Sequence, residues 1–278
     1  MTTSAEQMRA WNGPAILSYG FRPVFLFGSI WAAVAMLLWV FMLSGHKVLA
    51  TAFDPVSWHA HEFLFGYLGA ILAGFLLTAV PNWTGRLPMV GWPLGALVGL
   101  WIAGRLAMAT SAFLPWGVAA AIDLAFPLAL FAALAREVVT GRNWKNLPVL
   151  ALLLSMFIAN GLFHIEASQG SYPAKGFGLR LGLAVAVMLV SLIGGRIVPS
   201  FTRNWLAQRG STALPMPFGR NDGAVLLFSV AVLIVWVVWP EATTTAVVCG
   251  LAGVLHLWRM SRWSGHRIGA EALVWVLH

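Results

Sequence analysis

The stretch WHAHEFLFGYLGAILAGFLLTAVPNW (Trp58–Trp83) places His59, His61 and Glu62 at its start. The residues after Glu62 include no Asp, Glu, Lys, Arg or His, and apolar side chains dominate them. A helix of roughly 20 apolar residues crosses the ~30 Å hydrocarbon core of a bilayer. The stretch therefore predicts a membrane span that begins with two histidines and a carboxylate.

The whole chain repeats this pattern. It has 278 residues, of which 60% are hydrophobic and only 9% charged, whereas about a quarter are charged in a soluble protein. We therefore expect an all-α fold, a polytopic transmembrane helical bundle. Eight complete spans are predicted, and a ninth begins near Ile268: the eight lie at about 23–44, 59–81, 92–113, 115–137, 147–165, 177–199, 222–240 and 243–260.

These spans predict a single transmembrane helical domain over residues 1–278. The ninth span is cut off at His278, and a helix that stops inside lipid leaves its last carbonyls without partners. The expectation is therefore a longer protein with further helices. The single cysteine, Cys249, excludes a disulfide and a thiolate cluster within the chain. A metal or haem site must then use His, Met, carboxylates or backbone oxygens.

The positions of Lys and Arg predict the orientation, since cytoplasmic loops are enriched in them. Thirteen fall on the side of the N-terminus and three on the other, which places the N-terminus in the cytoplasm. The larger set is Arg9, Arg22, Arg86, Arg136, Arg142, Lys145, Arg196, Arg203, Arg209, Arg220, Arg259, Arg262 and Arg267; the smaller is Lys47, Lys175 and Arg180. The net charge of +8 reflects this bias, and nucleic-acid binding is not expected.

This orientation puts two histidine motifs on the outer face: His59, His61 and Glu62 at the start of the second span, and His164 and Glu166 at the end of the fifth. On a helix His59 and Glu62 share a face, while His61 points away unless the first turn frays. Neutral imidazole is a common ligand for copper, zinc and haem iron. The set predicts a metal or haem site, and the alternative is that each histidine is only an interfacial polar residue.

Carboxylates and an amide are available to support such ligands. A ligating histidine usually donates its other ring N–H to a carboxylate or carbonyl, and Glu62 and Glu166 are placed for that role. Asn160, one turn before His164, is placed to orient it. His278, in the apolar context VWVLH near the predicted midplane, is a further candidate for cofactor binding.

Two buried charges, Arg105 and Asp123, lie at equal distances from the turn between the third and fourth spans. They are predicted to form a structural ion pair; the alternative is that Arg105 binds an anion such as a haem propionate. Arg196, in the inner segment GGRIVPSFTRNW (Gly194–Trp205), has the same two alternatives: an anion ligand or an anchor at the lipid headgroups.

Four stretches together resemble the NnrS family: YGFRPVFLFGSIWA, WHAHEFLFGYLGAILAGFLLTAVPNWTGR, NGLFHIEA and GGRIVPSFTRNWL, in this order and spacing. The resemblance covers nearly the whole chain. It implies a bacterial inner-membrane protein of about twelve helices that contains haem and copper and acts in the response or resistance to nitric oxide.

The resulting hypothesis is a haem- and copper-binding membrane protein with a His/Glu site near the outer face and nitric oxide, or another small gas, as its ligand. The cofactor-binding candidates are His59, His61, His164 and His278; the metal-ligand candidates are His59, His61, Glu62 and His164; the supporting or anion-binding candidates are Glu166, Asn160, Arg105 and Arg196. Whether the protein is an enzyme stays open. The alternative is a membrane transporter of haem, a metal or a small solute.

Overall fold

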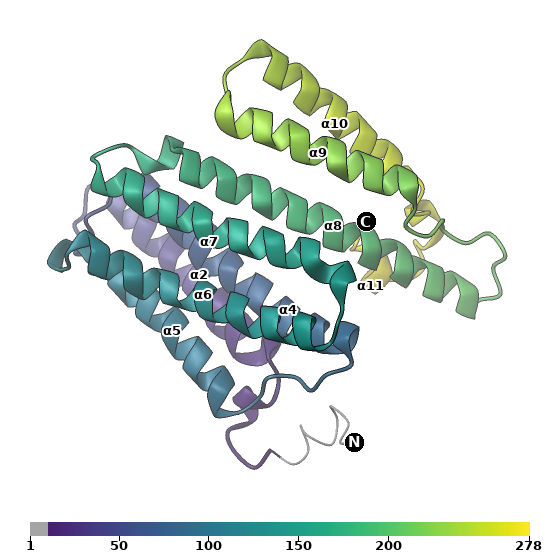
Figure 1. The fold of residues 1–278 in the computed structure, drawn as a ribbon, viewed down its shortest axis with the longest axis horizontal. Coiled ribbons are helices and arrows are strands. Elements are labelled where there is room, and N and C mark those ends of the chain that lie inside the picture. Colours follow the sequence, from purple (N-terminus) through teal and green to yellow (C-terminus); the bar gives the residue numbers. More distant parts are fainter. Residues whose placement is uncertain (1–10) are drawn as a thin grey trace. The chain divides into compact units, whose positions relative to one another are not determined.

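The computed structural model describes residues 11–278, and within that range all regular elements are helices (Figure 1). Arg9, counted above on the side of the N-terminus, lies outside the described residues. The long helices are α2 (Phe21–Leu43), α4 (Leu68–Thr84), α5 (Trp92–Ala109), α6 (Trp116–Thr140), α7 (Leu147–Ser168), α8 (Phe177–Gln208), α9 (Arg220–Val238) and α10 (Thr243–Ser261). The short ones are η1 (Ala15–Ser18), α3 (Pro55–His61), η2 (Glu62–Tyr67), η3 (Ser111–Phe113), η4 (Trp144–Asn146), η5 (Pro173–Lys175), η6 (Gly265–Arg267) and α11 (Ala272–Trp275).

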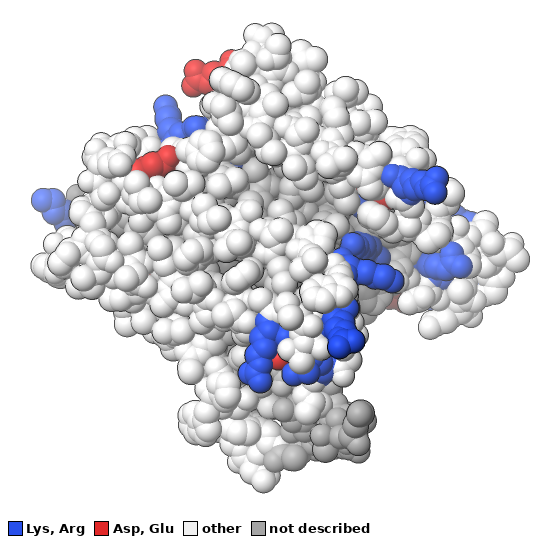
Figure 2. Space-filling model, in the orientation of Figure 1, with Lys and Arg blue, Asp and Glu red and all other residues white. Residues whose placement is uncertain are grey.

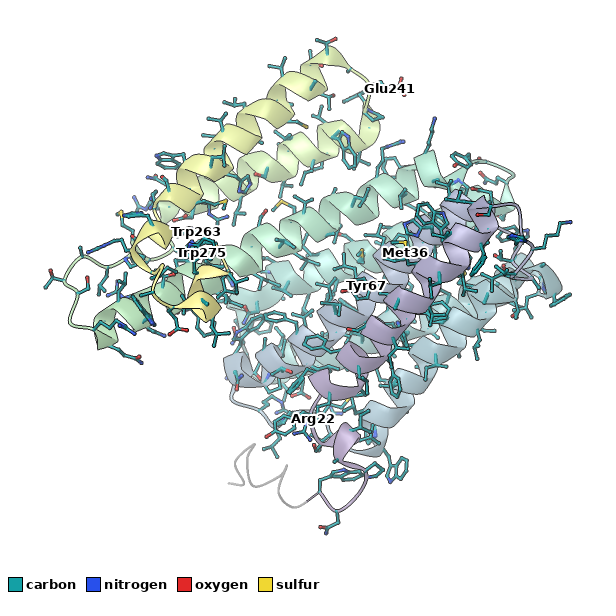
Figure 3. The ribbon with its side chains drawn as sticks, turned by 180° about the vertical axis from the view of Figure 1, so that it is seen from behind. Arg22, Met36, Tyr67, Glu241, Trp263 and Trp275 are labelled. Carbon is teal, nitrogen blue, oxygen red and sulfur yellow. The ribbon has the colours of Figure 1, made fainter. Side chains whose placement is uncertain are left out.

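The chain divides into two compact units, one reaching as far as Gly182 and the other comprising Leu183–His278, with the boundary inside α8. In the first unit α2 packs on α4, α5 packs on α6, and α6 also packs on α4 and α7 (Figure 1). Tyr67, at the end of η2, faces α2 (Figure 3). In the second unit α9 and α10 form an antiparallel hairpin (Figure 1).

Seven helical segments in the described part of the chain are long and apolar enough to cross a membrane. Charged side chains are sparse on the face of the molecule that Figure 2 shows, as expected for a surface that contacts lipid. The expected count of eight is approximate, because the predicted span at 243–260 forms helix α10 but is not among the seven. Its initial threonines, His256 and Arg259 lower its mean hydropathy. Around Ile268 the chain forms only the short helices η6 (Gly265–Arg267) and α11 (Ala272–Trp275), so the described residues contain no continuous helix where the start of a ninth span was expected.

Helix boundaries differ from the prediction most where proline and capping residues act. The second span begins at Pro55 rather than at position 59, because the Asp54 carboxylate accepts hydrogen bonds from the backbone N–H groups of Val56 and Ser57, each at 3.0 Å. Asp at the N-cap followed by Pro at the first helical position is a strong helix start. The second and sixth spans also continue past Pro81 and Pro199, since transmembrane helices tolerate an internal proline.

One π-helical turn, η2, joins α3 to α4 within this long second span. A π-turn shifts the hydrogen-bond register and is frequently found at functional sites. The Gly66 carbonyl in η2 accepts a hydrogen bond from the Trp101 indole N–H at 3.0 Å. The missing side chain of Gly66 makes room for the Arg105 guanidinium, because a Cβ there would overlap Arg105 Nη1. Glycine at this position therefore lets α5 bring a charged group against η2.

We predict that Gly66→Ala lowers the free energy of unfolding by about 1–3 kcal/mol, the usual cost of overpacking a core, although alanine favours helix over glycine by about 1 kcal/mol. Gly69→Ala is the matched control, since a Cβ at Gly69 meets nothing within 4 Å. Thermal unfolding of the detergent-solubilised proteins measures the difference. Equal melting temperatures for the two variants would contradict the packing argument.

Candidate metal centre

Three buried side chains from three helices converge in the first unit: His61 from α3, Asp123 from α6 and His164 from α7. One potential ligand atom from each lies within 4.8 Å of the other two. The Nε2 atoms of His61 and His164 are each 3.1 Å from Asp123 Oδ2. The three residues are 0%, 1% and 4% exposed, in that order. We call these three residues the metal cluster, because they form the cluster of metal-ligating side chains found among the described residues.

The depths of these residues along their helices explain why they meet. His61 lies six residues after the start of α3 and Asp123 seven after the start of α6. His164 lies four residues before the end of α7. At 1.5 Å per residue, these positions are about 6–10 Å from the helix ends. Because α3 and α6 begin, and α7 ends, on the same side of the unit, the three side chains lie at similar depth.

Asn160 lies one turn before His164 and extends the cluster. Its side-chain oxygen is 3.0 Å from His61 Nε2, and its side-chain N–H donates to Asp123 Oδ2 at 2.7 Å. The sequence analysis placed Asn160 beside His164 as an orienting residue. The structure brings it to His61 and Asp123, where it fixes the direction of the carboxylate.

Glu62 and Arg105 are the other two buried, charged residues in contact with the metal cluster. Arg105 donates to Glu62 Oε2 at 2.7 Å and also bonds to Asp123 Oδ1. Glu62 accepts a further hydrogen bond from the Trp31 indole at 2.6 Å, and its Oε1 is 3.2 Å from His61 Nδ1. The structure thus brings Arg105 and Asp123 together, and it adds Glu62 and Trp31, which the sequence analysis did not connect with them.

The charges in this network do not cancel. Glu62 and Asp123 carry two negative charges when ionised, and Arg105 carries one positive charge. An uncompensated charge away from water is costly. One more positive charge at the histidines balances the network, either as a proton on an imidazole or as a bound metal cation.

The geometry of the metal cluster fits a small metal ion. Zinc binds nitrogen and oxygen ligands at about 2.0–2.2 Å in a tetrahedral arrangement, which sets two ligand atoms roughly 3.3 Å apart. The two Nε2–Oδ2 distances of 3.1 Å are close to this value. Imidazole suits copper, zinc and iron. Two of the three ligand-to-ligand distances therefore match a metal with two nitrogen ligands and one oxygen ligand, and they are equally hydrogen-bond distances.

His59 does not join this cluster. Its ring stacks on Trp39 with a centroid distance of 3.8 Å and lies 4.4 Å from the Phe63 ring. The sequence placed His59 and Glu62 on one face of the helix, with His61 joining them only through a frayed first turn. The structure instead keeps His59 outside the cluster and brings in His61 from the last turn of a regular helix. His61 and Glu62, adjacent in sequence where α3 meets η2, both point into the interior, and His59 faces α2.

Glu166 also has a different partner from the one expected. Its carboxylate accepts hydrogen bonds from the backbone N–H groups of Phe177, at 2.6 Å, and Gly178, at 3.2 Å. Carboxylates stabilise helix N-termini because of the free N–H groups and the helix dipole there. Glu166 therefore caps α8 and does not support a histidine.

His278 and Arg196 belong to the second unit. His278 Nε2 is 2.8 Å from the Thr202 hydroxyl, and its ring lies 6.3 Å from that of Trp263. The Arg196 guanidinium lies 5.6 Å above the Phe218 ring. The structure does not assign either residue to the metal cluster.

Sequence reasoning missed Asp123 as a candidate ligand, although the signal was present. Asp54 followed by Pro55 marks the true start of the second span, and counting from there places His61 and Asp123 at nearly equal depth. A start at position 59 instead leaves His61 at the membrane surface, where Asp123 cannot meet it.

The comparisons with known proteins bear on this arrangement. The family model described as NnrS protein matches residues 15–278. The chain belongs to the NnrS family. Searches of curated proteins and of solved structures gave no match. In this NnrS protein, the described helices bring His61 of the second span and His164 of α7 to one buried site, so two of the four stretches that carry the resemblance meet in space.

We predict that Asp123→Asn lowers the free energy of unfolding by about 1–3 kcal/mol or more, because Asp123 accepts hydrogen bonds from Arg105 and Asn160 and a buried group that loses its partner costs this much. The matched control is Glu137→Gln on the same helix, where the Arg86–Glu137 pair is partly exposed and an exposed pair contributes only about 0–1 kcal/mol. Thermal unfolding in detergent compares the two. A larger loss for Glu137→Gln would show that the network around Arg105 is not the main electrostatic constraint.

Proposed function

We propose that this NnrS-family protein binds a metal ion, copper by family resemblance, at His61, Asp123 and His164, and that it acts in the response or resistance to nitric oxide. The observation that carries this proposal is the convergence of these three buried ligand atoms within 4.8 Å. The family resemblance supplies copper and nitric oxide. The same ligand set also suits zinc and iron, so the test measures all three metals.

The environment of His61 supports its role as a ligand. Its Nδ1 faces Glu62 Oε1 and its Nε2 faces Asp123 and Asn160. A carboxylate that accepts one ring N–H is the usual partner of a ligating histidine. A metal at Nε2 would replace the proton that this nitrogen shares with the oxygens of Asp123 and Asn160. Glu62 would hold the Nδ1 proton, while Nε2 would present its lone pair to the metal.

The other side chains have separate roles in this proposal. His164 Nε2 and Asp123 Oδ2 would be ligands, and Asn160 would orient Asp123 through its 2.7 Å hydrogen bond. Arg105 would hold Asp123 from the opposite oxygen. A copper ion bound here would supply a redox-active centre that binds a diatomic gas, and the buried position would exclude water. The positive charge of the metal would also balance the surplus negative charge of the carboxylates.

Haem, which the resemblance also implies, does not fit beside the metal cluster. The cavity next to Asn160 has a volume of about 30 Å³, whereas sites for cofactors occupy about 300–1,000 Å³. A groove of about 540 Å³ in the second unit is lined by His266, His278 and Met260, among others. Haem binding by this protein stays a prediction, and it is separable from metal binding at His61.

The proposed setting is the inner membrane of a bacterium with the N-terminus in the cytoplasm. The seven candidate spans support a multi-pass membrane protein, and the distribution of Lys and Arg supports the orientation. In that orientation α3 and α6 begin, and α7 ends, at the outer face. The metal cluster would then lie about 6–10 Å below that face.

Metal analysis of the purified full-length protein and of histidine variants tests the site. We expect His61→Ala and His164→Ala each to lose the bound copper, because each removes one of two imidazole ligands. His59→Ala is the matched control and is expected to keep the metal, since His59 only stacks on Trp39. Metal content per protein and an optical spectrum are measured for all variants at equal folded yield.

The outcomes separate the alternatives. Loss of copper from His59→Ala with retention in His61→Ala would overturn the assignment. A spectrum in which haem persists in all three variants would place haem elsewhere in the protein. A parent protein that contains neither haem nor metal would favour the transporter alternative.

Glu62→Gln tests the role of the carboxylate behind His61. Removing such a partner of a ligating histidine typically weakens metal binding by about 10–100-fold. Glu166→Gln is the control, because Glu166 caps α8, and its substitution is expected to leave metal affinity unchanged. Competition with a chelator of known affinity measures both variants. Equal metal affinity in parent and Glu62→Gln would remove Glu62 from the site.

A further inference from the structure

A small cavity adjoins the metal cluster in the first unit. It has a volume of about 30 Å³ and lies between η2, α4, α6 and α7. Its lining includes Asn160, whose side chain contacts both His61 and Asp123. Most of the other lining side chains, such as Leu130 and Met156, are apolar and buried. Two lining residues, Asn160 and Phe65, therefore connect the cavity with the metal cluster, since the Phe65 ring lies 5.3 Å from that of His61.

The lining of the cavity disfavours water. A volume of about 30 Å³ has room for a water molecule, but a buried water needs two to four polar partners. Asn160 is the polar side chain in the lining, and its oxygen and nitrogen are already engaged with His61 and Asp123. An apolar cavity of this kind stays dry and accepts xenon or another small apolar molecule. Size and chemistry thus match a diatomic gas.

The opening of the cavity lies at membrane depth. Gly69 and Pro127 are the half-exposed members of the lining, and the others are buried. Gly69 lies about 21 Å along the second span from Pro55, and Pro127 about 16 Å along α6 from Trp116. Both distances fall within the ~30 Å hydrocarbon core. Small apolar gases dissolve in hydrocarbon, so an opening at this depth admits them without passage through water.

Gly69 keeps this opening free. A Cβ built at Gly69 meets nothing within 4 Å, so no neighbouring helix requires a glycine here. Pro127 removes a backbone N–H from α6 on the other side of the opening, and an internal proline kinks a helix. The partly exposed portion of the lining therefore lies on α4 and α6.

We propose that this cavity is a gas-binding chamber that opens to the membrane interior between Gly69 and Pro127. It delivers a small apolar diatomic gas to the metal cluster past Asn160, a role that rests on the function proposed above. The route starts in the hydrocarbon core of the membrane and does not cross the outer face.

Xenon binding tests the chamber without reference to any metal. Crystals of the full-length protein pressurised with xenon are expected to show one atom in the cavity of the parent protein. Gly69→Phe, which adds a large side chain at the opening, and Leu130→Phe, which fills the cavity from inside, are expected to lose that atom. Gly99→Phe is the matched control, because Gly99 is an exposed glycine of α5 where a Cβ also meets nothing within 4 Å. Absence of xenon from the parent cavity would overturn the proposal.

Gas kinetics test the delivery. Carbon monoxide binds reduced copper, and flash photolysis measures its return. We expect Gly69→Phe to slow the association about tenfold at unchanged metal content, since binding would require a conformational opening, and Gly99→Phe to leave it unchanged. An unchanged rate in Gly69→Phe and Leu130→Phe would show that gas enters elsewhere. A parent protein without metal would refute the function proposed above, and the xenon result would still decide the chamber.

Discussion

The buried guanidinium of Arg105 is the constraint on which the first unit depends. It is 5% exposed and sits between Glu62 of η2 and Asp123 of α6. A buried charge is tolerated only with close partners. α5, α6 and the second span must therefore meet at the depth of Arg105, and each helix must be rotated so that its charged side chain faces the other two. The absence of a side chain at Gly66 follows from the same requirement. Helix packing in this unit is therefore specified by one ionic contact as well as by apolar fit.

Asp123 links this constraint to the proposed chemistry. Its Oδ1 bonds to Arg105, and its Oδ2 lies against His61, His164 and Asn160. The sequence analysis treated the ion pair and the histidine site as separate, and it weighed a structural role for Arg105 against a ligand-binding one. In the structure one carboxylate belongs to both. The arginine that stabilises the fold also holds the oxygen available to a metal in place.

Much of the fold was predictable from the sequence, because a chain that crosses a membrane can adopt few kinds of structure. The helical class, the NnrS family and the equal depth of Arg105 and Asp123 all followed from hydropathy, motifs and counting. Helix rotation and exact boundaries did not. A four-residue error at the start of the second span hid the equal depth of His61 and Asp123, and helical periodicity favoured His59 over His61. The rotation of α3 is set by a π-turn and by the stacking of His59 on Trp39. Neither feature leaves a periodic signal in the sequence.

The second unit shows why the sign of the net charge around a buried arginine matters. There Asp222 pairs with Arg259 at 3.1 Å and lies 3.6 Å from Arg262, so two guanidinium groups share one carboxylate and the surplus is positive. The same Asp222 carboxylate accepts the Gly219 backbone N–H at 2.9 Å at the start of α9, and Arg259 donates to the Ser191 carbonyl at 3.0 Å. These are contacts that join helices and offer nothing to a cation.

Around Arg105 two carboxylates share one guanidinium group, and the surplus charge, which lies beside two imidazoles, is negative. Both units bury an arginine–aspartate pair, but the negative surplus beside two imidazoles, on which the proposed metal binding depends, belongs to the pair in the first unit.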